Sequence, residues 1–231
     1  MMATKIASAF VKQNPQDERS LKEVWTNIQP DSCPTHYNFH LHTVFSDGQL
    51  QPQEVIEQVV AIGLQGLAIT DHHTVDGFRI AQQYLAEMDS SAKIPQLWTG
   101  VEITSLLLTV DVHILGYAFD PSCPALLPYL TGSAPKGKAA QADRVIDAIH
   151  QAGGLAVLAH PERYRRSANK LVPTAVKLGI DGVETYYAYR HVDPWQPSSK
   201  QTQQVKQLSD RYGLFNTCGT DTHGKDLLLR R

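Results

Sequence analysis

Short apolar runs alternate with longer amphipathic segments along most of this chain, and this alternation limits the possible folds more than any other feature. The runs that have the character of buried strands are 37–42, 66–70, 96–104, 112–119, 154–160, 182–187 and 215–221. The segments with helical apolar spacing are 52–63, 74–88, 139–153, 169–179 and 197–213. Strands that alternate with helices predict an α/β fold, with a mostly parallel sheet that is covered by helices.

One pair of strands is expected to depart from the parallel pattern. Only residues 105–111 separate the runs 96–104 and 112–119, which is too few for a crossover helix, so we expect that pair to be antiparallel. The segment 131–141 is rich in small residues and lysine, and it is either a flexible lid or a long connection.

Residues 1–35 are expected to form a helical extension and a linker, and residues 36–231 a single domain. In the extension, Asn14 is the expected N-cap and Pro15 the first helical residue. No apolar stretch is long enough for a signal peptide or a membrane span, so the cytoplasm is the expected location. An apolar stripe predicts that the helix packs on the domain; it consists of Leu21, Val24, Trp25 and Ile28.

Charge and cysteine content exclude some partners. The net charge of the 231-residue chain is −2, so no overall field attracts it to a nucleic-acid duplex or an anionic membrane, and neither is an expected partner. The cysteines Cys33, Cys123 and Cys218 show no paired spacing, and we expect free thiols in a reducing compartment.

The segment "FHLHTVFSDG", residues 39–48, carries the first sign of chemistry. His40 and His42 are two positions apart, so in an extended strand both imidazoles point to the same side. Asp47 follows in a Ser-Asp-Gly turn, where it could bind a metal or only cap the turn. Taken alone, the pair fits a metal site and also fits two surface histidines before a turn.

The ends of the other expected strands decide between these alternatives. Nearly every strand carries a histidine or a carboxylate there: Asp71, His72, His73, Glu102, His113, His160, Glu184, Asp221 and His223. The carboxyl ends of parallel strands share one face, where active sites are built. Imidazole and carboxylate ligands suit Zn²⁺, Mn²⁺ and Fe²⁺, and the candidates are too many for one ion, so a cluster of two or three is expected.

The ordered motifs HxH, SDG, TDH, GVE, HILG, AHP and GTDTHG, from about residue 38 to the C-terminus, resemble the PHP family, named for polymerase and histidinol phosphatase. The resemblance implies a distorted (β/α)7 barrel and a trinuclear metal centre. The implied ligands are His40, His42, Glu102 and Asp221 for the first ion; Glu102 as a bridge, His113 and His160 for the second; and Asp47, His72 and His223 for the third.

Other residues are expected to support the ligands or to contact substrate. Asp71 and Glu184 are expected to lie behind the ligands, with Asp71 orienting a histidine through its second ring nitrogen. Arg163 resembles the arginine that often follows the AHP motif, and it would hold phosphate oxygens in a bidentate fork. The remaining candidates for substrate contact are His73, Tyr164 and Tyr187; His73 could equally be solvated, and the tyrosines could equally be packing residues.

The expected function is hydrolysis of a phosphate ester of a small metabolite, a nucleotide or a short oligonucleotide. The resemblance implies attack by a hydroxide between the first two ions, with the bridging Glu102 and with Arg163 on the phosphoryl oxygens. The acid that protonates the leaving group stays open among a metal-bound water, His73 and a ligand histidine.

Two other classes of function compete with this one. An amidohydrolase also begins with HxH, but no lysine stands at a strand end here to form a carbamate bridge. A non-catalytic metal-binding module is disfavoured because the implied ligand set is complete.

The spacing between two implied ligands bears on the substrate. Relatives that act on small nucleotides often carry a sizeable insertion between the HILG and AHP motifs. Here His113 and His160 are only 47 positions apart, so this insertion is short or absent. A more open site could accept a phosphodiester or an oligonucleotide 5′ end.

Overall fold

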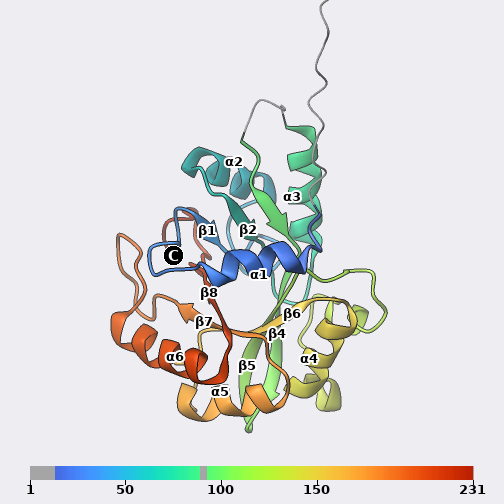
Figure 1. The fold of residues 1–231 in the computed structure, drawn as a ribbon. Coiled ribbons are helices and arrows are strands. Elements are labelled where there is room, and N and C mark those ends of the chain that lie inside the picture. Colours follow the sequence, from blue (N-terminus) through green and yellow to red (C-terminus); the bar gives the residue numbers. More distant parts are fainter. Residues whose placement is uncertain (1–13, 89–92, 231) are drawn as a thin grey trace, which may run out of the picture.

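The computed structural model describes residues 14–88 and 93–230, whose strands form two sheets (Figure 1). The smaller sheet is parallel and contains β1 (Tyr37–Asn38), β2 (Gly66–Ala68) and β3 (Gln96–Trp98). The larger sheet contains β4 (Gly100–Leu107), β5 (Val110–Tyr117), β6 (Leu155–Leu158), β7 (Gly182–Tyr186) and β8 (Phe215–Cys218), in that order. β5 is antiparallel to both of its neighbours, and β6, β7 and β8 are parallel, so the expected antiparallel pair is confirmed.

The expected single strand 96–104 is two strands in different sheets, which corrects the sequence prediction. The break falls at Thr99, whose hydroxyl donates to the carbonyl of Phe119 at 2.9 Å. At the next residue, Gly100, a Cβ would collide with the carbonyl oxygen of Ile69, so only glycine lets the chain cross to the second sheet here.

Backbone hydrogen bonds join the two sheets at their edges. The amide of Phe39, after β1, donates to the carbonyl of Cys218 in β8 at 3.1 Å. On the other side, the amide of Glu102 in β4 donates to the carbonyl of Asp71, after β2, at 3.2 Å. These contacts bring the carboxyl ends of strands from both sheets to one place.

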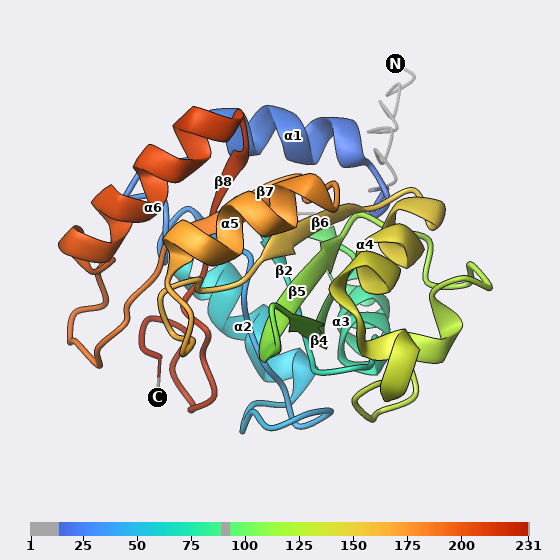
Figure 2. The same cartoon turned by 90° about the horizontal axis from the view of Figure 1, so that it is seen from below.

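The helices lie outside the sheets (Figures 1 and 2). α2 (Pro52–Ile62) and α3 (Asp76–Glu87) lie beside the smaller sheet, and α4 (Ala142–Gln151), α5 (Ala168–Lys177) and α6 (Ser199–Tyr212) beside the larger one. The stretch 131–141 belongs to the connection between β5 and α4, which also holds the short 3₁₀ turns Leu127–Tyr129 and Gly137–Ala140. No helix in the described ranges is long and apolar enough to cross a membrane.

The N-terminal helix α1 (Glu18–Thr26) begins later than the sequence predicts. Its N-cap is Asp17, whose carboxylate accepts from the amide of Ser20 at 3.1 Å. Asn14 instead accepts from the amide of Gln16 at 3.1 Å, which closes a turn before the helix. Residues 1–13 of the expected extension lie outside the described residues.

Packing of α1 on the domain is confirmed. The Trp25 ring meets Tyr117 at 5.2 Å and Phe39 at 6.0 Å between centroids, both edge to face. These side chains belong to an apolar cluster between the strands, distinct from the larger core under the outer helices. The hydroxyl of Tyr117 donates to the carbonyl of Phe39 at 2.8 Å, so the cluster fixes the backbone directly before His40.

Candidate metal centre

Three residues in or beside the candidate cluster have unusual backbone conformations. His73, His160 and Asp221 have φ angles of 56°, 26° and 54°, in the left-handed region that non-glycine residues rarely adopt. Such strain persists where the surrounding structure enforces it and is typical of functional sites. Gly219 adds a close approach, because a Cβ there would collide with the side chain and backbone of His40.

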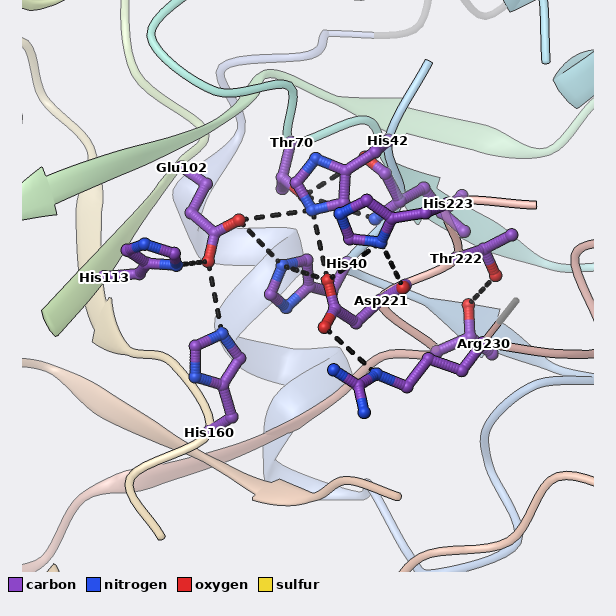
Figure 3. Close-up of polar contacts among 12 residues, drawn as sticks. His40, His42, Thr70, Glu102, His113, His160, Asp221, Thr222, His223 and Arg230 are labelled. Carbon is purple, nitrogen blue, oxygen red and sulfur yellow. Dashed lines mark hydrogen bonds and ion pairs between the residues drawn. The ribbon is translucent and has the colours of Figure 1, made fainter. Parts of the chain in front are cut away.

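The first group contains His40, His42, Glu102 and Asp221, which point toward one another (Figure 3) and are all buried. His40 Nε2 lies 3.1 Å from Glu102 Oε2 and 3.4 Å from Asp221 Oδ1. His42 Nε2 lies 3.2 Å from each of the same two oxygens, yet it makes no hydrogen bond of good geometry with any residue that the structure describes. Two imidazole nitrogens and two carboxylate oxygens converge here, and such a set of ligand atoms fits a divalent cation between them.

The other carboxylate oxygen of Glu102 serves a second group. Oε1 lies 2.6 Å from His113 Nδ1 and 3.3 Å from His160 Nε2. Among the described residues, neither ring nitrogen of His160 has a hydrogen-bond partner, although both are buried. Glu102 therefore lies between two sets of imidazoles, one on each oxygen, as a bridging ligand would.

A third group lies on the open side of the site, around Asp47, whose side chain is 55% exposed. Its carboxylate is 3.2 Å from His223 Nε2 and 3.7 Å from His72 Nε2. His72 also lies 3.5 Å from Glu102 through Nδ1, so it stands between this group and the second. Asp47 thus faces imidazoles and does not only cap its turn.

The charges of the cluster suit a cation. Burial would raise the pKa values of Glu102 and Asp221, but the surrounding histidines hold both well below their usual range. Burial lowers the pKa of His72 to about 4. Burial also acts to lower the pKa of His42, but the carboxylates of Asp221 and Glu102 raise it to about 9. In the metal-free protein, the protonated ring of His42 therefore supplies positive charge between the ionised carboxylates of Asp221 and Glu102.

The two supporting carboxylates behave differently. Glu184 lies 2.9 Å from His40 Nδ1 and accepts from the amide of His160 at 2.9 Å, so it contacts a candidate ligand on the side away from the other carboxylates. Asp71 does not contact a histidine ring in the described part of the chain. It accepts from the amide and hydroxyl of Thr43 at 2.7 and 2.6 Å and from Ser46 at 2.8 Å, and so fixes the turn that carries Asp47.

The expected substrate residues are mostly engaged by the protein. Arg163 Nη1 donates to Asp221 Oδ2 at 3.0 Å and to the hydroxyl of Tyr187 at 3.1 Å. Tyr187 is fully buried and donates to the same Oδ2 at 2.6 Å, so it lies behind a ligand and offers no open face for stacking. The hydroxyl of Tyr164 accepts from the amide of His113 at 2.8 Å. Both tyrosines therefore hold candidate ligand residues in place.

His73 is buried, which excludes the solvated alternative. Its Nε2 lies 3.2 Å from the hydroxyl of Thr104, and its amide donates to the carbonyl of Glu102 at 3.0 Å. Burial lowers its pKa. The ring centroid is 6.1 Å from that of His72, so His73 lies next to the cluster without joining it.

Sequence reasoning missed Arg230, which also reaches Asp221 (Figure 3). Its Nε donates to Asp221 Oδ2 at 3.4 Å, and its guanidinium carbon lies 5.2 Å from the centre of the Tyr187 ring. The segment that follows His223 has no strand pattern and no motif, so no signal in the sequence pointed to this arginine.

The fold and the site together define an α/β protein with a largely buried cluster of histidines and carboxylates at its strand ends that could bind metal ions. The model of the PHP domain matches residues 38–223, most of the chain, and the chain belongs to the PHP family. Its membership and its relatives make it a metal-dependent phosphoesterase, a hydrolase of phosphoric ester bonds.

Three relatives illustrate the range of the similarity. The 5′-3′ exoribonuclease Rnm of Salmonella typhimurium is 25% identical, over 81% of this chain and 85% of the relative. A 3′,5′-nucleoside bisphosphate phosphatase of Chromobacterium violaceum is 37% identical, over 52% of this chain but only 39% of the relative. A solved structure from Bifidobacterium adolescentis, described as a metal-dependent phosphoesterase, matches with a TM-score of 0.67 at 25% identity, over 85% of this chain and 90% of that chain.

Proposed function

We propose that the protein hydrolyses a phosphate ester of a nucleotide or of an oligonucleotide 5′ end at a trinuclear centre. The observation that carries the proposal is the position of Glu102, whose two oxygens face different sets of imidazoles. The names of the exoribonuclease and of the bisphosphate phosphatase support this class of substrate. The donor set suits Mn²⁺, Zn²⁺ or Fe²⁺.

Three groups of residues would each bind one of the ions. His40, His42 and Asp221 would hold one ion, His113 and His160 a second, and the group around Asp47 a third, with Glu102 shared. Bound ions would supply Lewis acidity to the phosphoryl oxygens and lower the pKa of a nucleophilic water. Arg163 would add positive charge beside the phosphate, because only one of its nitrogens is engaged by the described protein.

The strands are proposed to form the distorted seven-stranded barrel that the family resemblance implies. Residues 1–35 are proposed as an extension of a domain over residues 36–231. The cytoplasm stays the predicted location.

The test is phosphate release from adenosine 3′,5′-bisphosphate by the purified protein with Mn²⁺, with chelator, and as the His113→Ala variant. We expect release that requires both the metal and His113, with a loss of about a hundredfold or more in kcat for the variant. The matched control is His191→Ala, which removes an exposed histidine in the loop after β7.

An absence of release from protein that demonstrably binds Mn²⁺ would contradict a phosphomonoesterase. The same preparations would then be given a 5′-phosphorylated single-stranded oligonucleotide, and failure with both substrates would reject the proposed function.

A further inference from the structure

The turn that carries Asp47 exposes two large apolar side chains. Val44 and Phe45 are 40% and 37% exposed, and they come directly before the Ser-Asp-Gly segment. They lie next to the open side of the site, where Asp47 itself is more than half exposed. Adjacent apolar side chains in water beside a polar site are typical of a surface that contacts a ligand.

Hydrogen bonds hold this turn in one conformation. Asp71 accepts from the amide of Thr43 at 2.7 Å and from the hydroxyl of Ser46 at 2.8 Å, so it ties together the two residues that flank the apolar pair. The amide of Phe45 donates to the hydroxyl oxygen of Thr43 at 3.2 Å, and the amide of Ser46 donates to the carbonyl of Thr43 at 3.0 Å. The backbone that carries the Phe45 ring is therefore already ordered, and a ligand that contacts the ring does not have to order it.

The distance along the chain limits which part of a substrate can reach this ring. Two peptide units separate Phe45 from Asp47, so the Cα atoms of these residues are at most about 8 Å apart. A phosphate bound at the cluster and a group joined to it through one sugar can therefore lie beside Asp47 and Phe45 at the same time. In a nucleotide, that group is the base.

The chemistry of the apolar pair favours a base over the other parts of a nucleotide. An aromatic ring and an aliphatic side chain offer no hydrogen bond to a phosphate or to a sugar hydroxyl, whereas every base has a flat face that stacks on an aromatic ring. Asp47 is the only charged residue in the segment 43–48, and its carboxylate faces imidazoles. The segment therefore has no cation of its own with which to bind a second phosphate.

We infer that Phe45 stacks on the base of the nucleotide that carries the cleaved phosphate, and that Val44 extends this apolar surface. Phe45 is then a specificity residue, which favours nucleotides over sugar phosphates that have no base. This inference rests on the proposed function, whose substrate class it narrows.

The test compares adenosine 5′-monophosphate with ribose 5-phosphate, which has the same ester but no base, as substrates of the Mn²⁺-loaded protein. We expect the wild type to prefer the nucleotide about tenfold in kcat/KM and Phe45→Ser to lose this preference, mainly through KM. Phe45→Tyr keeps the ring and should keep the preference. The matched control is Leu127→Ser, which removes an exposed apolar side chain from the 3₁₀ turn after β5.

An equal loss for both compounds in Phe45→Ser, or no loss for either, would overturn the inference. If the wild type releases phosphate from neither compound, calorimetric titration of both into the Mn²⁺-loaded protein separates this inference from the proposed function. Tighter binding of the nucleotide that Phe45→Ser removes would support stacking although the proposed hydrolysis had failed. Equal binding of the two compounds by the wild type, or no binding of either, rejects it.

Discussion

At the scale of single residues, Glu184 is the carboxylate whose effect on metal binding is easiest to isolate. It is buried, it contacts His40 Nδ1, and its other oxygen accepts from the amide of His160. In the native protein the charge of Glu184 favours a proton on Nδ1 of His40, which leaves Nε2 of that ring free to bind metal. Glu184→Gln keeps the shape of the side chain but removes this charge. Support of this kind is worth about 10- to 100-fold in metal affinity, and we expect a loss of that size.

Competition with a chromogenic chelator measures this affinity directly. The matched control is Glu87→Gln in α3, an exposed glutamate whose partner is Gln83. An affinity for Mn²⁺ equal to that of the wild type in Glu184→Gln would show that Glu184 does not orient a ligand.

Sequence could predict the candidate ligands but not all of their neighbours. His40, His160 and Asp221 were predictable because polar residues at strand ends meet on one face whatever the details of the fold. The partners of Asp71 and the burial of Tyr187 depend on how turns and loops pack against one another, and Arg230 reaches the site only through the path of the segment after His223. No spacing in the sequence encodes these contacts.

At the scale of elements, α1 is expected to stabilise the strands beneath the site. Trp25 is buried against Tyr117, Phe39 and Phe215, with ring centroids 5.2 to 6.0 Å apart. Replacing a buried tryptophan by alanine costs about 3–5 kcal/mol, because apolar contact is lost and a cavity is left. We expect Trp25→Ala to lower the free energy of unfolding by that amount in urea denaturation.

The control for this change lies in the same helix. Glu23→Gln alters a residue whose side chain is 68% exposed, and its ion pair with Arg19 is worth less than about 1 kcal/mol. If Trp25→Ala were no more destabilising than Glu23→Gln, α1 would not belong to the folding core.

The order and type of the elements were predictable, while their ends were less so. Apolar runs separated by amphipathic segments correctly predict the strands and helices, and the short segment 105–111 correctly predicts an antiparallel pair. The run 96–104 gave no sign of a break, because both of its halves are apolar. They differ only in the strand with which each one pairs: β3 pairs with β2, and β4 pairs with β5. The start of α1 was misplaced because Asn14 and Asp17 are equally good caps in isolation, and packing decides between them.

At the scale of the whole molecule, the candidate centre brings together segments that are distant in sequence, since His40 and Asp221 lie near opposite ends of the proposed domain. A metal that binds only the folded state stabilises it by about 2.7 kcal/mol when its concentration is a hundredfold above Kd. For a chain of this size that corresponds to a rise of about 5–10 °C in Tm. We expect such a rise on adding Mn²⁺ to chelator-treated protein, measured by thermal unfolding.

This metal-dependent rise in Tm should itself grow with pH. In the metal-free protein the pKa of His42 is raised from 6.5 to about 9, so its proton stabilises the fold fully below about pH 6.5 and this contribution is lost as the pH rises through 9. Metal binding must displace that proton, so metal affinity increases over the same interval. The difference in Tm between loaded and metal-free protein should therefore widen from about pH 6 to about pH 9. Glu102→Gln, which removes the shared carboxylate, should abolish this widening. A difference in Tm that stays constant or shrinks in the wild type would mean that protonated His42 does not occupy the metal position.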